Sequence, residues 1–150
     1  MPHSFNHCLM HCVFSTKGRA KMLTPELRER LWPYLGGIAR EHKMKALATG
    51  GADDHVHMLL SLPATISVSK AVQTMKGVSS KWIHDTFPAW KNFAWQEGYG
   101  AFSVSVSLVA KTVHYINTQE GHHRAKDFKE EFRSFLKAHG MEYDERHIWG

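Results

Sequence analysis

Residues 50–63 read GGADDHVHMLLSLP and are the most informative stretch of the chain. From Asp54 to Leu62 the pattern is typical of a β-strand, which Pro63 ends. Side chains along a strand point alternately to its two faces. One face receives Val56, Met58, Leu60 and Leu62. The other face receives His55, His57, Leu59 and Ser61. The alternation therefore predicts two imidazoles side by side on one face of a sheet, roughly 6–7 Å apart at Cα.

Two neighbouring neutral imidazoles can bind one divalent cation. Two histidines on a solvated or hydrogen-bonded sheet face would give the same sequence pattern. Asp53 and Asp54 precede the pair and allow two interpretations of their own. A carboxylate there can orient an imidazole, and an aspartate is also common in turns.

The same periodicities predict the other elements. Period-two alternation predicts strands over residues 6–15, 44–49, 54–62 and 101–107. Helical spacing predicts helices over 25–42, 67–85, 108–120 and 126–139. Thr24 followed by Pro25 is a helix start, and residues 50–53 predict a turn.

This order of elements predicts an α+β fold. A βαββαβ sequence forms an antiparallel, ferredoxin-like or RRM-like sheet with its two crossover helices on one face. The two C-terminal helices are then available to cover the other face. We find no internal repeat or linker, so residues 1–150 are expected to form a single domain.

Composition favours an ordinary globular chain with an anionic partner. The 150 residues are 43% hydrophobic and 22% charged, and no apolar run reaches the ~20 residues of a membrane helix. We expect a cytoplasmic protein without membrane association, nucleoid-associated when bound to DNA. The net charge of +5 is compatible with nucleic-acid binding and equally with a solvated basic surface.

The N-terminal strand carries the two cysteines. Cys8 and Cys12 would lie about 13 Å apart on one face of it, too far for a disulfide. Alternation sends His7 and His11 to the opposite face, which disfavours a metal site shared with the cysteines.

A second polar cluster, YINTQEGHH, covers residues 115–123. Tyr115 and Gln119 are four residues apart and would share a helix face, away from the centre of an apolar stripe. A phenol can act as a nucleophile, and an amide oxygen is an acceptable ligand for a hard cation. Packing is the ordinary role of a tyrosine at helical spacing, so this motif alone decides nothing.

Together these motifs resemble the single-tyrosine HUH transposases of small bacterial insertion sequences, including the REP-associated tyrosine transposases. His55-Val56-His57 matches the defining His-hydrophobic-His motif. Further matches, in the expected order, are HCVFSTKGR, MKGVSSKWI, WQEGYGAFSVSVS and YINTQEGHH.

The resemblance implies a role for each motif residue. His55, His57 and Gln119 would be metal ligands, and Tyr115 would be the nucleophile. The implied reaction cleaves single-stranded DNA, leaves a 5′-phosphotyrosine and a free 3′-hydroxyl, and rejoins strands by the reverse attack. Members of this family act as homodimers on imperfect DNA hairpins at element ends, and the tyrosine helix can complete the partner's site.

The expected cofactor is a divalent metal, Mg²⁺ or Mn²⁺, because hard ions suit phosphate chemistry. No nucleotide cofactor is expected, since the sequence has no phosphate-binding glycine loop. Five basic residues are candidates for DNA contact: Lys17, Arg19, Lys76, Lys81 and Arg124. The alternatives are a non-catalytic hairpin-binding regulator, a phosphodiesterase that uses water as its nucleophile, and a structural metal protein.

Overall fold

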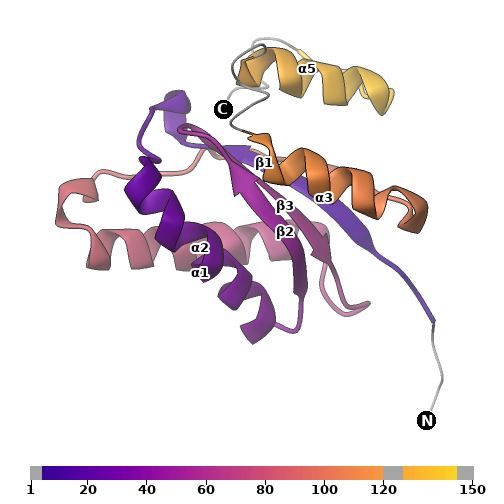
Figure 1. The fold of residues 1–150 in the computed structure, drawn as a ribbon, viewed down its shortest axis with the longest axis horizontal. Helices are drawn as coiled ribbons and strands as arrows, with labels where there is room; N and C mark the ends of the chain where they lie inside the picture. The colour runs from indigo at the N-terminus through magenta and orange to yellow at the C-terminus, as the bar shows by residue number, and fades with distance from the viewer. Residues whose placement is uncertain (1–4, 120–126, 145–150) are drawn as a thin grey trace.

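The fold is built on a four-stranded antiparallel sheet (Figure 1). The computed structural model describes residues 5–119 and 127–144. The strands are β1 (Leu9–Ser15), β2 (Lys45–Gly51), β3 (His55–Ser61) and β4 (Gly100–Ser103). They lie in the order β2-β3-β1-β4, and each neighbouring pair is antiparallel. This is the ferredoxin-like arrangement, so the predicted fold class is confirmed.

Helices α1 (Pro25–Glu41) and α2 (Val68–Thr86) cover one face of the sheet, as expected. Each begins with a hydroxyl cap: Thr24 accepts from the Leu27 amide, and Ser67 accepts from the Lys70 amide. The main hydrophobic core lies between these helices and the sheet. From β3 it takes Val56, Met58 and Leu60, the residues that alternation assigned to one face.

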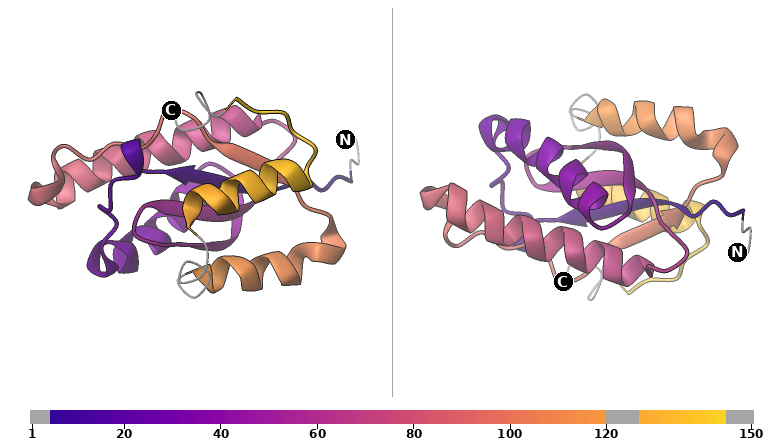
Figure 2. Two further views of the ribbon diagram at one scale, coloured as in Figure 1. Left: turned by 90° about the horizontal axis from the view of Figure 1, so that it is seen from above. Right: turned by 90° about the horizontal axis from the view of Figure 1, so that it is seen from below.

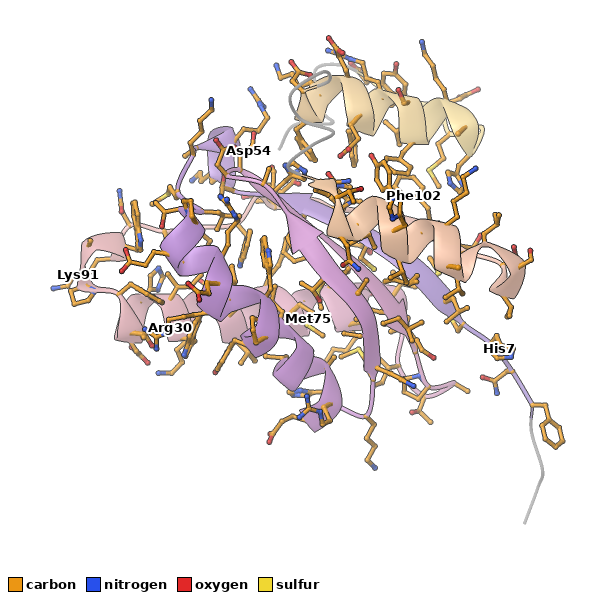
Figure 3. All side chains as sticks on the ribbon, in the orientation of Figure 1. His7, Arg30, Asp54, Met75, Lys91 and Phe102 are labelled. Atoms are coloured by element: carbon orange, nitrogen blue, oxygen red, sulfur yellow. The ribbon has the colours of Figure 1, made fainter. Side chains whose placement is uncertain are left out.

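Helices α3 (Val109–Asn117) and α5 (Phe128–Ala138) cover the other face (Figures 1 and 2). Ile116 of α3 packs on Leu59 of β3 and Ala48 of β2. From α5, Phe132 packs against Phe102 of β4. Figure 3 labels Phe102 on this side of the sheet and Met75 of α2 on the other. The C-terminal helices therefore supply the cover that the order of elements predicts.

In the described part of the chain, short 3₁₀ turns join the main elements at three places: η1 (Lys17–Arg19), η2 (Pro88–Trp90) and η3 (Val106–Leu108). Of these, η1 follows β1 directly. The backbone of Thr16 donates to the carbonyl of Asp54 at 2.9 Å, which fixes the start of η1 beside the start of β3. Among the described residues, no helix is long and apolar enough to cross a membrane.

Three strand boundaries differ from those predicted by more than one residue. β1 begins at Leu9 rather than at residue 6. β2 continues through Gly50 and Gly51, which we expected in a turn; the chain reverses just after them. β4 ends at Ser103, not at residue 107, because Ser103 already pairs with Met10 and β1 begins one residue earlier, at Leu9, whose carbonyl accepts from the Val104 amide.

The C-terminal helices also differ from the prediction. α3 begins one residue late and ends at Asn117, with Thr118 as its C-cap, so Gln119 follows the helix that carries Tyr115. The last predicted helix begins at Phe128, where Asp127 caps it by accepting from the Glu130 amide at 2.9 Å. Its expected start at Lys126 lies outside the described residues.

Candidate functional site

His55 and His57 lie next to each other on the sheet face that α3 and α5 cover. Both side chains are fully buried, and their ring centroids are 5.1 Å apart. Val56 and Met58 point into the core on the opposite face. The prediction that the two imidazoles share one face is therefore confirmed.

Each imidazole is held through its Nδ1 atom by a different neighbour. The Nδ1 atom of His55 lies 2.7 Å from Oδ1 of Asp54, so this aspartate orients an imidazole. The Nδ1 atom of His57 lies 2.7 Å from Nε2 of His11 on β1. Val13 is the direct partner of His57, and His11, two residues earlier, reaches it diagonally. Both rings therefore present their Nε2 atoms to the covering helices.

Gln119 reaches this pair from the end of the α3 segment. Its side chain is 1% exposed, and its Oε1 lies 3.3 Å from Nε2 of His55. Its Nε2 donates to the carbonyl of Tyr115 at 3.2 Å, which keeps the amide oxygen directed at the histidine. The expected approach of Gln119 to the histidines thus occurs within one chain.

Glu131 of α5 is a further acid at this site, and the sequence analysis did not select it. Its side chain is buried, and its Oε1 lies 2.8 Å from Nε2 of His57 and 3.7 Å from Nε2 of His55. Its other oxygen, Oε2, accepts a hydrogen bond from the hydroxyl of Tyr115. One carboxylate therefore connects the histidine pair to the tyrosine.

Tyr115 is half-buried and faces the histidines. Its ring centroid lies 5.8 Å from that of His57 and 6.2 Å from that of His11. Burial, followed by the negative charge of Glu131, raises the pKa of the Tyr115 phenol above its usual range. The hydroxyl is thus held protonated, with the Glu131 carboxylate as its acceptor.

A cleft of about 520 Å³ opens beside Tyr115 between α3 and α5. His11, Tyr115 and Glu131 line its inner part, and Lys111 of α3 also lines it. The cleft gives a ligand access to the tyrosine, while the histidines behind it stay buried. A second cavity lies on the far side of the molecule, between α1 and Val78 of α2, away from these groups.

The donor set fits a divalent cation. Two imidazole nitrogens, from His55 and His57, converge with a carboxylate oxygen of Glu131 so that all three candidate ligand atoms lie within 4.8 Å of one another. The amide oxygen of Gln119 lies on the same side of His55. Imidazole with carboxylate and amide oxygens suits Mn²⁺ and other borderline ions as well as Mg²⁺.

The basic residues chosen from the sequence lie in different surroundings. Lys17 and Arg19 form η1, and Thr16 just before it is bonded to the Asp54 carbonyl, one residue from His55. Arg124 lies outside the described residues.

The two candidate lysines on α2, Lys76 and Lys81, belong to the opposite side of the sheet from the histidines. Lys76 donates to the backbone carbonyls of residues 96, 97 and 98, at 2.8, 3.3 and 2.6 Å. Partial burial lowers the pKa of Lys76 to about 8. Lys81 pairs with Asp85 on the exposed surface at 2.8 Å. A phosphate contact by Lys76 would require its bonds to this loop to break.

His11 and Glu131 are the residues of this site that sequence reasoning missed. Alternation did place His11 on the face opposite the cysteines. Had β1 and β3 also been predicted to pair as neighbouring strands, His11 would have been expected beside His57. For Glu131 the available signal was an acid between Phe128 and Phe132 on the apolar face of a helix.

An antiparallel ferredoxin-like sheet with a His-hydrophobic-His pair under a tyrosine-bearing helix defines the class of HUH transposases. Comparison with known proteins agrees with this class. The family model described as "Transposase IS200 like" matches residues 4–119. The chain therefore belongs to the IS200-like transposase family, and the resemblance noted in the sequence is confirmed. Membership places it among DNA-processing enzymes.

Individual relatives support the same assignment. The chain is 29% identical over 124 residues to the transposase for insertion sequence element IS200 of Salmonella typhimurium, covering 79% of this chain and 81% of that one. It is 26% identical over 114 residues to the ISDra2 transposase TnpA of Deinococcus radiodurans, covering 73% and 81%.

Two solved structures share the fold. A chain from Deinococcus radiodurans R1, described as a candidate transposase, matches with a TM-score of 0.64 and 25% identity, over 79% of this chain and 95% of that one. A REP-associated tyrosine transposase, solved bound to a REP hairpin, matches with a TM-score of 0.59 and 16% identity, over 82% and 74%.

Proposed function

We propose that this chain is a DNA strand transferase that cleaves and rejoins single-stranded DNA through Tyr115. The observation that carries the proposal is the meeting of His55, His57, Gln119 and Tyr115 in one site of a chain from a transposase family. The substrate would be single-stranded DNA with hairpins at element ends. The protein would act as a homodimer in the cytoplasm.

In the proposed reaction the Tyr115 oxygen attacks the scissile phosphorus. The bond from phosphorus to the 3′-oxygen breaks, the 3′-oxygen takes up a proton, and the 5′-phosphate remains esterified to the tyrosine. The ester conserves the energy of the broken phosphodiester, so a 3′-hydroxyl can attack it and restore the DNA strand. No nucleotide cofactor is needed for this exchange.

The residues of this chain supply positioning and a proton acceptor. The phenol proton of Tyr115 already points at Oε2 of Glu131. His55, His57 and Gln119 would hold a divalent ion, Mg²⁺ or Mn²⁺. When bound, such an ion polarises a phosphate oxygen and offsets developing negative charge.

DNA would approach through the cleft between α3 and α5. Lys111 lines this cleft, and η1 carries Lys17 and Arg19 near the start of β3. Phosphate groups bind such cations, and this binding weakens as salt concentration rises. Lys81, on the opposite side of the sheet, and Arg124, outside the described residues, stay predicted DNA contacts that this approach does not use.

The test is formation of a covalent adduct on labelled hairpin DNA in the presence of Mn²⁺, detected by denaturing gel electrophoresis. Tyr115→Phe should abolish the adduct and keep DNA binding. Tyr34→Phe is the matched control, because Tyr34 stacks on Trp82 in the α1–α2 layer and should form adduct normally.

Other results would assign a different function. Undiminished adduct in Tyr115→Phe would show that the nucleophile is another residue. Cleavage that survives Tyr115→Phe but is lost in His57→Ala would indicate a phosphodiesterase that uses water. Hairpin binding without adduct, across several hairpins and metals, would indicate a regulator.

A further inference from the structure

Glu131 is the most unusual side chain of the site, since it comes from a helix outside the matched family region. The family model matches residues 4–119, whereas α5 spans Phe128–Ala138. The match therefore assigns no role to Glu131.

The packing of α5 directs Glu131 at the sheet. Phe128, Phe132 and Leu136 repeat every four residues and are buried against β1 and β4 or against His55. Glu131 lies on this same face and is 3% exposed, while Glu130 beside it is exposed. A carboxylate buried among aromatic rings is costly unless charge or hydrogen bonds compensate it.

The position of the carboxylate oxygens suits a metal ligand. Oε1 of Glu131 lies 2.8 and 3.7 Å from the Nε2 atoms of His57 and His55. Two ligand atoms on one ion, each at about 2.1 Å from it, lie roughly 3–4 Å apart. An ion among these three atoms would therefore need only small side-chain shifts.

The surroundings of the histidines point to the same three atoms. Asp54 and His11 occupy the two Nδ1 atoms, so the Nε2 atoms are the ones that remain directed at Glu131.

We propose that Glu131 is a carboxylate ligand of the ion held by His55 and His57, and that its other oxygen fixes the Tyr115 hydroxyl beside that ion. The inference rests on the proposed function and extends its ligand set beyond Gln119. A carboxylate adds negative charge to two neutral imidazoles and an amide, which strengthens binding of hard divalent ions. It also makes docking of α5 part of the metal site.

The experiment is a calorimetric titration of the whole protein with Mn²⁺, in the absence of DNA. Glu131→Gln should lower Mn²⁺ affinity by at least about tenfold, since even groups that only orient metal ligands matter by 10–100-fold. Glu130→Gln, the same change at the exposed neighbouring position, should stay within about twofold of the parent. Glu131→Asp keeps the charge on a shorter side chain and should fall between them.

Thermal melting of both proteins in EDTA separates a binding defect from a folding defect. With metal removed, the melting temperature of Glu131→Gln should be no lower than that of the parent. If Glu131→Gln binds Mn²⁺ as tightly as the parent, or more tightly, the carboxylate is not a ligand. It would then only occupy the ion's position in the metal-free protein, and the inference is wrong. If the parent itself binds no Mn²⁺, the metal requirement in the proposed function fails as well. The titration thus distinguishes the two failures.

Discussion

At the scale of single residues, the site depends on neighbours that are not candidate ligands themselves. Asp54 and His11 each hold one Nδ1 atom of the histidine pair. His11 is 4% exposed, and burial is the main reason that its pKa falls to about 3. The Nε2 atom of a neutral His11 can either accept a hydrogen bond from Nδ1 of His57 or donate one to it. His11 can therefore hold the His57 ring in place in either tautomer of His57.

This burial predicts an acid-sensitive stability. The pKa of His11 is about 3 in the folded chain against 6.5 for the ordinary side chain, so the unfolded chain binds more protons between these values. Stability is therefore present above about pH 6.5 and is lost as the pH falls toward 3. Between pH 7 and 5 His11 should lower the unfolding free energy by about 2 kcal/mol.

Urea denaturation in EDTA at pH 7 and pH 5 measures this loss. His11→Asn keeps a polar partner for His57 and should show a smaller loss on acidification. His7→Asn, at an exposed position before β1, should behave like the parent. An equal loss in His11→Asn and in the parent would assign the acid sensitivity to other groups.

At the scale of elements, the contact between β2 and α3 decides where the tyrosine lies. A Cβ atom added to Gly50 would lie 2.3 Å from the backbone oxygen of Ile116, so only glycine allows α3 to pass this close. Residues 50–53 look like a turn in the sequence because a glycine pair is a common turn signal. The reason for Gly50 is visible only once α3 is placed against the sheet.

Gly50→Ala should therefore push α3 away from the sheet and displace Tyr115. We expect a loss of about 1–3 kcal/mol in unfolding free energy, typical of overpacking. Adduct formation should fall by more than about tenfold, because small misplacement of a nucleophile is costly.

Gly77→Ala is the matched control, since a Cβ at this position of α2 meets nothing within 4 Å. It should stabilise the protein by about 0.5–1 kcal/mol, as expected for glycine in a helix, and leave the adduct unchanged. Urea melts and adduct time courses measure both effects. Parent-like stability and rate in Gly50→Ala would contradict the close packing of α3 on β2.

The sequence predicted the elements better than their ends. Alternation identified β1 and β3 and placed His55 and His57 on the correct face, because a strand period depends only on local spacing. The end of β4 depends on where its partner β1 begins, and Gln119 lies beyond α3 because the helix ends at Asn117. Glu131 entered the site through tertiary packing of α5, which no local pattern specifies.

At the scale of the whole molecule, the two helical layers have different tasks. Helices α1 and α2 enclose the main hydrophobic core and carry none of the proposed ligands. The proposed ligands come from β3, from the segment after α3, and from α5. A bound ion would therefore connect the sheet to the C-terminal layer, and its effect on stability should be concentrated there.

Hydrogen exchange followed by mass spectrometry tests this division. Saturating Mn²⁺ should slow amide exchange in α3 and α5 more than in α1 and α2, because the ligands join only the first pair to β3. At 100 times the dissociation constant, the ion should stabilise the fold by about 2.7 kcal/mol. His57→Ala should lose both effects, whereas His7→Ala, at an exposed position, should keep them. Equal slowing in all four helices would mean that the ion stabilises the chain as one unit, and the proposed link between sheet and C-terminal layer would be wrong.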